Sequence, residues 1–497
     1  MIRGARRADL AFGAILIASG LIASFTLTSG HDWGDDFAAY LLQAQAILQG
    51  APGEFVHGNR VTIERSVEFL GPVVYPWGFP LLLTPFLWGF GLDPIALKVP
   101  GLGCFLAVLG VLWLGVADRL SVSFRLMLVS ILAFNPSFLL FLDNILSDIP
   151  FLLAASFALV LMDKWTRTPM TRSAIRPGAL LGVALAVAFL VRVNGALLMP
   201  VLAASTLLNG RLWELLRARG ASLAAVLAML SPYVVCGVLA LLWTAVLPSG
   251  DYVSTAPVTL LTMTRDEMVD QAEYYALLPA SFYAGLPNPV GLYVATLPFF
   301  LVGATRATRR DLPFLVYLVF SLALFVTWHQ RQGLRFIMPV LPFYVLFMLM
   351  GVEAACSASR RHARAWRALA LLVLWCIVMS FALVSLTNAD NIQRDRHIDD
   401  GPFTADASEM FEFVRTQTPA DSVIVFFKPR ALKLLTGRQS FQSDRLQDLV
   451  PGMYVCLYLA TGGYNQLQLD TAERLMTEGR LQAVSRSGRY ALFRVEY

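Results

Sequence analysis

The sequence predicts a polytopic α-helical membrane protein with about eleven transmembrane helices and a small α/β domain at its C-terminal end. The first observation is composition: of 497 residues, 57% are hydrophobic and 15% are charged, whereas soluble domains average roughly 45–50% apolar and roughly 25% charged residues. The second is that the apolar residues form runs, many of which approach the about 20 residues that cross a hydrocarbon core. The third is the placement of the basic residues between these runs.

The basic residues determine the orientation of the helices. They form short clusters at residues 3–7, 119–125, 164–176, 211–219, 306–310 and 360–367. Cytoplasmic loops of membrane proteins carry such an excess of Lys and Arg, and all of these clusters fall on one side when about eleven helices span the membrane. The N-terminus is then cytoplasmic. The same topology accounts for the net charge of +5 without any nucleic-acid partner.

The expected spans follow in order along the chain. They cover residues 10–28, 95–117, 126–142, 149–162, 177–191, 195–208, 222–246, the run that ends at Arg306, 312–328, the run before Arg360, and 368–386. Residues 77–90 are apolar and aromatic but short and rich in Pro and Gly, so we expect a half-inserted helix at the outer interface there. Counting them as a span would place the later basic clusters outside.

This topology divides the chain into two parts. Residues 1–386 form the membrane domain, with outer loops at about 29–94 and 248–288, and residues 387–497 form a domain on the external side. In the second part, helical spacing alternates with β-branched and aromatic runs, which predicts a small α/β domain. It shows no obvious catalytic set. The expected helices are 404–416, with Asp406 and Ser408 as candidate caps, 431–436 and 471–478, and the expected strands are 422–427, 453–459 and 489–495.

The five cysteines give no sign of a metal or disulfide framework. Four of them lie in or beside apolar runs, and none forms a CxxC pair. Zinc sites and small disulfide-rich folds are recognised by regularly spaced cysteines, so the sequence predicts neither.

Two adjacent carboxylates open the first outer loop. Asp35 and Asp36 point about 100° apart if they lie on a helix, so they do not form a close carboxylate pair. Either one of them faces a pocket while the other caps the helix expected at 37–49, or both are N-terminal caps favoured by the helix dipole. The sequence alone leaves both interpretations open.

Further charged residues lie at the outer ends of the spans. Asp143 and Asp148 follow the third span, where solvation at the interface is the simplest explanation. Arg192 separates two short apolar runs, and a cation at membrane level needs an anion, water or the headgroup region. A lipid phosphate is one such anion. The other cations near this face are Arg331, Arg335 and Lys98.

One face therefore gathers carboxylates and cations at membrane level. An enzyme that transfers a group from a lipid phosphate to a polar acceptor needs this combination: cations hold the phosphate, a carboxylate accepts the acceptor's proton, and fixed cations stabilise the charge that grows on the leaving phosphate. The alternative is a transporter or flippase of a lipid-linked or anionic substrate. Transporters place ionisable residues near the midplane and often repeat their halves, whereas these spans have almost uncharged centres and no visible internal repeat. A third interpretation is that the chain is related to such enzymes but has lost their activity.

Five segments resemble, in order, those of GT-C fold glycosyltransferases. The stretch Asp35-Asp36-Phe-Ala-Ala-Tyr40 is similar to the first outer loop of the bacterial relatives of protein O-mannosyltransferases and of the lipid A aminoarabinose transferase, a glycosyltransferase family 39-like group. That group has Glu where this chain has Asp36. The other segments that match are 75–83, 142–148, 190–195 and 335–342.

The resemblance implies a glycosyltransferase of a bacterial inner membrane that acts on the periplasmic side, among membrane lipids. It implies transfer of a sugar, with inversion, from a polyprenyl-phosphate donor to a hydroxyl of an envelope protein, lipid or polysaccharide. Asp35 is then the general base. The implied residues, by role, are catalytic Asp35, Asp36 and Asp148, donor-phosphate-binding Arg192, Arg335 and Arg331, and substrate-binding Tyr40, Tyr75, Asp143 and Asn194.

Two features of the family remain open in this chain. Many relatives work without a metal, whereas the oligosaccharyltransferase branch needs a divalent ion between acids of two outer loops, and Asp35 with Asp148 leaves such an ion open. The aminoarabinose branch also has a Lys ahead of its proline-rich segment. Val74 or Tyr75 stands at that place here, so this chain lacks the Lys for the corresponding phosphate contact.

Overall fold

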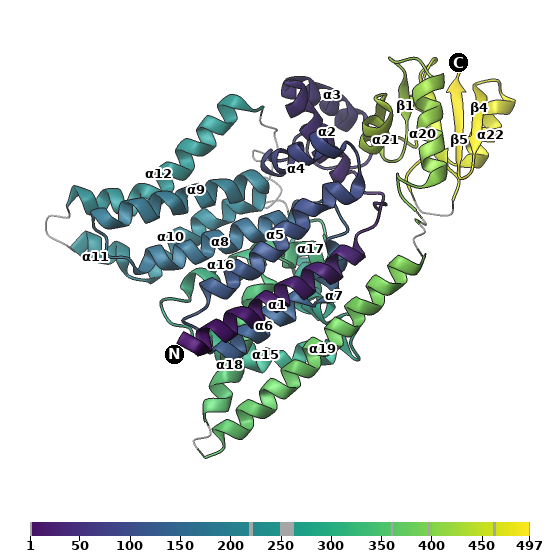
Figure 1. The fold of residues 1–497 in the computed structure, drawn as a ribbon. Helices are drawn as coiled ribbons and strands as arrows, with labels where there is room; N and C mark the ends of the chain where they lie inside the picture. The colour runs from purple at the N-terminus through teal and green to yellow at the C-terminus, as the bar shows by residue number, and fades with distance from the viewer. Residues whose placement is uncertain are drawn as a thin grey trace.

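The computed structural model describes residues 2–217, 222–248, 263–358, 361–395, 398, 400–460 and 464–496. Residues 249–262 of the predicted second outer loop lie outside the described residues. Figure 1 shows a bundle of long helices, a group of short helices (α2, α3 and α4) beyond one end of it, and a sheet domain next to that group. The long helix α19 runs from the bundle toward the sheet domain.

The bundle corresponds to the predicted membrane domain. Of the described helices, 7 are long and apolar enough to cross a membrane: α1 (Ile2–Thr26), α5 (Pro94–Gly115), α8 (Asp148–Arg167), α9 (Ile175–Val191) with the preceding 3-10 turn η1 (Arg172–Ala174), α12 (Leu223–Val246), α18 (Leu341–Ala358) and α19 (Ala363–Asp395). The other predicted spans are shorter apolar elements, namely α6 (Val122–Ala133) with α7 (Pro136–Phe141), the 3-10 helix η2 (Val193–Leu197) with α10 (Leu198–Leu208), α15 (Pro289–Thr305) and α16 (Leu312–Val326). The helical membrane fold is confirmed, and the count of eleven spans stays a prediction.

Two of the predicted spans are interrupted or bounded by short breaks. The third is divided before Pro136, where the Asn135 side chain accepts hydrogen bonds from the backbone N–H groups of Ser137 and Phe138 and so caps α7. The fifth ends at Val191, and Arg192 has an extended backbone before η2 begins. The sequence predicted this second break.

Short helices cover the end of the bundle where the first outer loop lies. They are α2 (Asp36–Gln49), α3 (Pro52–Arg65), α4 (Gly78–Phe90), α14 (Arg265–Leu277) and the 3-10 helix η3 (Leu278–Tyr283), and two further short helices, α11 (Arg211–Arg217) and α17 (Leu334–Ile337), connect bundle helices. The 13 residues of α4 make a helix about 20 Å long, which is shorter than a hydrocarbon core of roughly 30 Å. Trp88 and Phe90 near its end are 80% and 65% exposed, as expected for a helix that dips into lipid.

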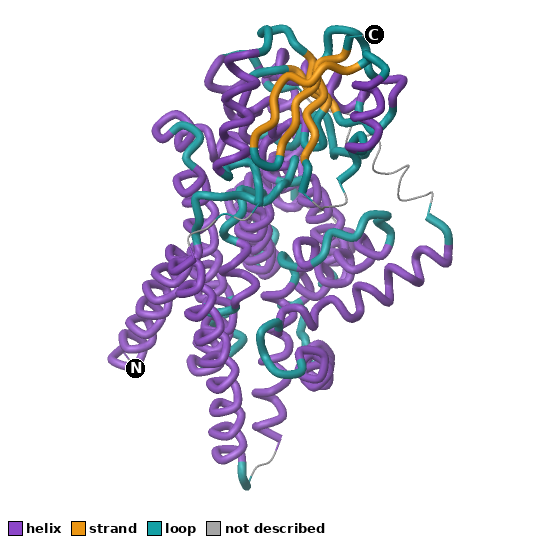
Figure 2. Tube along the Cα trace, turned by 90° about the vertical axis from the view of Figure 1, so that its right-hand side faces the viewer, coloured by secondary structure: helices purple, strands orange, loops and turns teal. Residues whose placement is uncertain are grey.

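The C-terminal domain is a five-stranded mixed sheet with helices (Figure 2). The strand order is β2-β1-β3-β5-β4; β1 is parallel to β2 and β3, and β5 is antiparallel to β3 and β4. The elements are α20 (Ala405–Gln417), β1 (Val423–Val425), α21 (Pro429–Thr436), β2 (Gln439–Phe441), η4 (Leu446–Asp448), β3 (Tyr454–Tyr458), α22 (Leu469–Thr477), β4 (Leu481–Ser487) and β5 (Tyr490–Val495). The predicted helices and strands are confirmed, whereas β2 and β4 were not predicted.

Two details of this part differ from the prediction. The side chain of Thr404 caps α20 by accepting from the Ala407 N–H, so neither Asp406 nor Ser408 is the cap; Asp406 instead pairs with Arg489. The last bundle helix also continues past the predicted boundary at residue 386, to Asp395.

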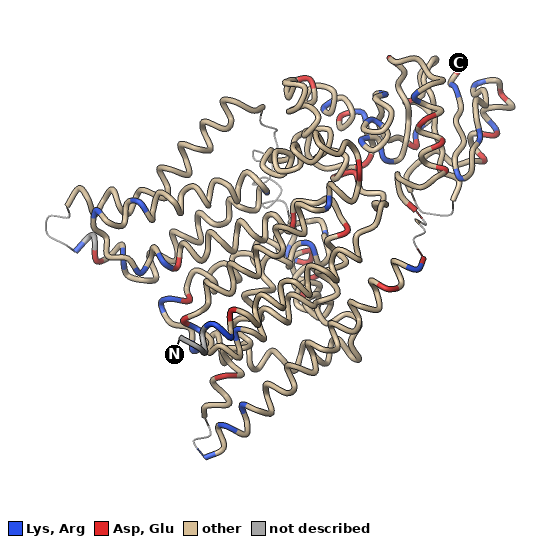
Figure 3. Tube along the Cα trace, in the orientation of Figure 1, with Lys and Arg blue, Asp and Glu red and all other residues tan. Residues whose placement is uncertain are grey.

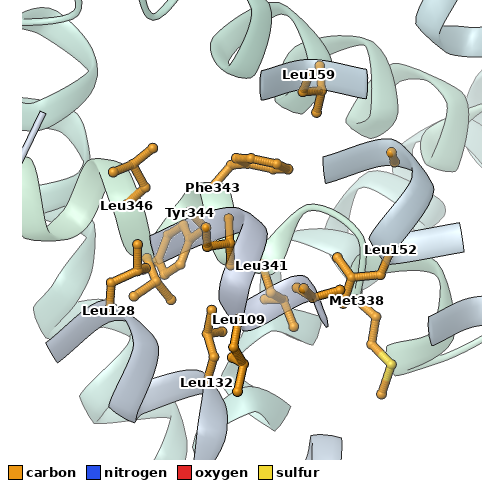
Figure 4. Packing of buried hydrophobic residues seen from close by; sticks show 14 of the residues in the cluster. Leu109, Leu128, Leu132, Leu152, Leu159, Met338, Leu341, Phe343, Tyr344 and Leu346 are labelled. Atoms are coloured by element: carbon orange, nitrogen blue, oxygen red, sulfur yellow. The ribbon is translucent and has the colours of Figure 1, made fainter. Parts of the chain in front are cut away.

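The main apolar core lies among the bundle helices. Figure 4 shows side chains from α5, α6, α8 and α18 gathered in it, among them Leu109, Leu128, Leu152 and Leu346. The helices α15 and α18 approach each other closely, because a Cβ at Gly351 would lie only 1.8 Å from the Phe299 carbonyl oxygen. Small residues at such crossings let backbones pack closely in membranes.

A second core joins the first outer loop to the C-terminal domain. The backbone N–H of Val67 donates to the Gln442 carbonyl at 3.0 Å, and the Thr62 hydroxyl donates to the Ser440 carbonyl at 2.8 Å. The domain is therefore docked on α3 through its edge strand β2. The apolar cluster beneath this contact includes Trp33, Phe37, Phe79, Ile145, Phe411, Phe426 and Phe427.

Charged residues stand mainly at the ends of the bundle helices, and the tube between these ends is mostly uncharged (Figure 3). Arg119 pairs with Asp163 at 2.9 Å and with Asp311 at 2.7 Å, joining the ends of three helices. Asp148 lies at the other end of α8 from Arg167. The 20 residues between these ends span about 30 Å, the thickness of a hydrocarbon core.

Candidate functional site

A cavity of about 400 Å³ lies between the first outer loop, the start of α8, the end of α9, α17 and the segment before α21. Its walls carry both acidic and basic side chains. The predicted site residues that line it are Asp35, Asp36, Tyr40, Tyr75, Arg192, Asn194 and Arg335. Most of the predicted site therefore converges, although its residues come from distant parts of the sequence.

Close backbone packing fixes where Arg192 enters the cavity. A Cβ at Gly78, the first residue of α4, would lie 2.5 Å from the Leu190 carbonyl oxygen. A Cβ at Gly195 would lie 2.4 Å from the Ala188 carbonyl carbon. Only glycine permits both approaches, so α4 and η2 press against the end of α9 and the chain turns outward at Arg192.

Asp35 lies just before α2 and is 8% exposed. It occupies the N-cap position, but its side chain makes no capping hydrogen bond. Its Oδ1 accepts a hydrogen bond from the Arg430 backbone N–H at 3.2 Å, and its Oδ2 lies 3.4 Å from Arg430 Nε. Burial raises the pKa of Asp35 to about 6, although Arg430 and Lys428 oppose this shift. A carboxyl group with a pKa near the working pH suits a general base.

Asp36 faces the other way, as the helical geometry predicts. It accepts a hydrogen bond from the Tyr75 hydroxyl at 2.5 Å and another from Arg335 Nη2 at 3.1 Å. Burial alone would raise the pKa of Asp36, but Arg335 and the Tyr75 hydroxyl outweigh burial and lower it. Asp36 thus remains ionised and holds Arg335 in place. The two carboxylates have different partners and different proton affinities.

Asp148 lies behind the two arginines. It is 1% exposed, Arg192 Nη1 lies 2.7 Å from its Oδ1, and Arg335 Nη2 lies 3.2 Å from its Oδ2. The arginines line the cavity and the Asp148 side chain does not. Because a buried carboxylate needs such pairing, Asp148 orients both guanidinium groups toward the cavity.

Neutral polar groups complete this wall. The hydroxyls of Tyr40 and Ser147 lie 2.9 Å apart, and Arg192 Nη1 donates to the Ser147 hydroxyl at 3.3 Å. Burial raises the pKa of Tyr40, so its hydroxyl stays protonated. Asn194 lines the cavity two residues after Arg192.

Two predicted site residues lie elsewhere. Asp143 binds the buried ammonium of Lys98 at 2.6 Å, and this pair joins the loop after α7 to α5 away from the cavity wall. Arg331 pairs with Asp270 and donates from Nε to the Gln271 side chain at 3.1 Å. These partners already occupy both side chains, so the structure gives neither of them a place in the cavity.

The C-terminal domain contributes cations to the cavity that were not predicted from the sequence. Arg430 is 1% exposed and contacts Asp35, and Lys428 lines the cavity. Two cations flanking Pro429 at the start of a predicted helix were the only local signal. Nothing in the sequence connects them with an acid near the N-terminus.

The residues present do not fit a divalent metal between Asp35 and Asp148. A divalent cation needs several oxygen ligands, whereas each of these carboxylates already faces a guanidinium group. Within the part of the chain that the structure describes, no three His, Cys, Asp or Glu side chains are grouped so that they could hold a metal ion. No metal is assigned to this site.

No protein-family model and no curated protein sequence matches the chain. Solved structures do. ArnT from Cupriavidus metallidurans bound to undecaprenyl phosphate matches with a TM-score of 0.59 at 14% identity over 97% of both chains. The archaeal oligosaccharyltransferase AglB from Archaeoglobus fulgidus, solved with an inhibitory peptide and a dolichol-phosphate, matches with a TM-score of 0.55 at 12% identity, over 90% of this chain and 69% of that one. The chain therefore has the GT-C fold of these membrane proteins, as the sequence predicted.

Proposed function

We propose that the protein is a membrane glycosyltransferase that moves a sugar from a polyprenyl-phosphate donor to a hydroxyl acceptor, with inversion. One observation carries the proposal: a buried carboxyl, Asp35, and two fixed guanidinium groups, Arg192 and Arg335, face the same cavity. This is the set that such a displacement requires. The shared GT-C fold supports it, because neighbours with this fold are glycosyltransferases solved with lipid phosphates.

The reaction is a single displacement. The acceptor oxygen forms a bond to the anomeric carbon while the bond from that carbon to the phosphate oxygen breaks. Asp35 takes the proton of the acceptor hydroxyl. The phosphate leaves with the bonding electrons, and Arg192 and Arg335 stabilise the charge that it gains. Asp36 and Asp148 act through these arginines, and Tyr40, Tyr75 and Asn194 shape the cavity around the sugar.

We place the cavity on the periplasmic side of the bacterial inner membrane, with the N-terminus in the cytoplasm and the C-terminal domain outside. The basic clusters near Arg119 and Arg167 lie at the opposite end of the bundle from the cavity, and basic loops mark the cytoplasmic side. The acceptor is an envelope protein, lipid or polysaccharide. We place the domain boundary in the segment after α19. The second outer loop and the C-terminal domain are the parts of the chain that select the acceptor.

A carrier function receives less support. Carriers bind their substrate near the bilayer midplane between repeated halves. Here the charged residues of the cavity lie at the outer ends of α8 and α9, and the described span centres are almost uncharged.

The test is sugar transfer in membranes that contain wild type, Asp35→Asn or the control Asp390→Asn. Asp390 is an exposed residue of α19 that forms an ion pair with Arg394. Radiolabelled polyprenyl-phosphate sugars are offered one at a time, with a crude envelope fraction as acceptor. Wild type and Asp390→Asn should transfer one of the sugars, and folded Asp35→Asn should lose roughly 10²–10⁴-fold, the typical contribution of a general base. Full activity of Asp35→Asn removes Asp35 from the mechanism. No transfer by wild type from any donor would overturn the proposed function.

A further inference from the structure

The C-terminal domain inserts a buried cation beside Asp35. Arg430 stands in the first turn of α21, and its side chain is 1% exposed. Besides its two contacts with Asp35, its Nε donates to Asn59 Oδ1 at 3.2 Å and its Nη2 donates to the Pro72 carbonyl at 2.7 Å. Three separate segments of the first outer loop thus meet at one guanidinium group.

This cation dominates the charge around Asp35. The charged groups that face Asp35 are Arg430 and Lys428 from the C-terminal domain and its neighbour Asp36. Lys428 is partly buried and lies farther away, since Arg430 alone comes within 4.0 Å of the Asp35 carboxylate among the described residues. Asp36 itself is held by Arg335 and Tyr75 on its far side. Ionising a buried carboxyl is costly unless a cation compensates it.

We infer that Arg430 is a positioning residue that orients the Asp35 carboxylate and keeps it ionised, so that the C-terminal domain is an integral part of the catalytic site. The inference rests on the proposed function. Each carboxylate oxygen has two acceptor positions, so Asp35 can be held by Arg430 and still accept a proton from the cavity side. Arg430 touches no reacting atom.

A purely structural role for Arg430 is the rival explanation, since it also fastens the domain to the first outer loop. The two roles differ in their effect on the pH dependence of transfer. If Arg430 only holds the domain against the first outer loop, its loss lowers the amount of folded protein at every pH. Loss of the cation beside a general base raises the pKa of that base and moves the acidic limb of the pH–rate profile.

The experiment measures kcat/KM against pH for wild type, Arg430→Gln, Arg430→Lys and Arg438→Gln. Arg438 is the matched control, because it fastens the same domain internally through the Thr418 and Arg415 carbonyls and has no contact with Asp35. In Arg430→Gln the acidic limb should move up by about 1–3 pH units, the usual effect of an adjacent opposite charge. In Arg430→Lys the limb should stay within about half a unit of wild type. A lysine has one nitrogen, which cannot stand in the places of both Nε, beside Asn59 and Asp35, and Nη2, which donates to the Pro72 carbonyl, so kcat should fall roughly tenfold.

Each result decides the matter. The inference is overturned if active Arg430→Gln has the same acidic limb of the pH–rate profile as wild type. It is also overturned if Arg438→Gln shifts this limb as much as Arg430→Gln does. In both cases the proposed function still stands. If Arg430→Gln does not fold, Arg430→Lys replaces it: wild-type kcat in this variant overturns the positioning role. If wild type transfers no sugar at any pH, the proposed function fails and the inference fails with it.

Discussion

The replacement of Arg335 tests the electrostatic part of the mechanism most directly. Its Nη2 lies 3.1 Å from Asp36 and 3.2 Å from Asp148, so one guanidinium group joins the acids of two outer loops. In Arg335→Gln the positive charge is lost where charge develops on the phosphate. Removing one such group costs roughly 10²–10³ in kcat.

Arg335→Lys separates charge from shape. In wild type, Arg335 donates from Nη2 to Asp36 and from Nε to Asp148. The single nitrogen of a lysine cannot stand in both places, so the variant keeps the charge but loses at least one of these hydrogen bonds. A hydrogen bond to a charged group contributes about 1.5–3 kcal/mol, which corresponds to a loss of roughly 10- to 150-fold in rate. The variant should therefore fall between wild type and Arg335→Gln.

Single-turnover transfer from a labelled polyprenyl-phosphate sugar measures these losses without interference from product release. Arg331→Gln is the control, because Arg331 stands four positions earlier but pairs with Asp270 outside the cavity. It should keep activity within about threefold of wild type, the range of a surface change. If Arg335→Gln keeps wild-type activity, or Arg331→Gln loses as much, the assignment of Arg335 to the donor phosphate is wrong.

Further predictions concern pH, metal and stability. Wild-type transfer should decline as the pH falls through about 6, because the pKa of Asp35 is raised to about 6 and only its ionised form accepts a proton; a pH–rate profile that is flat from 5 to 8 contradicts this. A chelator should leave transfer unchanged, since the acids face guanidinium groups; lost activity that added divalent ions restore would show a metal. Asp143→Leu leaves the buried Lys98 ammonium without its acid and should lower the free energy of unfolding by about 3–5 kcal/mol, whereas adding Lys98→Met should recover most of the loss in thermal unfolding. Gly351→Ala should lower the unfolding temperature because its Cβ would meet a backbone oxygen at 1.8 Å, whereas Gly237→Ala, with nothing within 4 Å, should not.

Hydropathy predicted the bundle well because lipid imposes a simple requirement. Every backbone polar group in the bilayer must be paired within a helix, so each span leaves a long apolar run in the sequence. The break at Arg192 could also be predicted from the sequence, since a cation between two short apolar runs is costly in a continuous membrane helix. The confirmed helices and strands of the C-terminal domain were likewise marked by local spacing.

Features that depend on contacts between residues far apart in the sequence could not be predicted from the sequence. The strand β4 is mostly exposed and polar, and it is a strand because it pairs with β5. Arg331 and Arg335 stand in similar surroundings in the sequence, and only the start of α17 after Gly333 turns one of them toward the cavity. The sequence resemblance implied a catalytic Asp148, whereas in the fold Arg192 and Arg335 lie between Asp148 and the cavity.

The contact between Asp35 and Arg430 also governs when a newly made chain can become active. Its two partners are 395 positions apart, and ribosomes add about 5–20 residues per second. The first outer loop therefore waits roughly 20–80 s for its cation. During that time the loop lacks the strand β2 on which it packs, as well as the charge that offsets a buried acid. Chains that stop before α21, or whose last domain fails to fold, should carry an incomplete centre even when every membrane helix is in place.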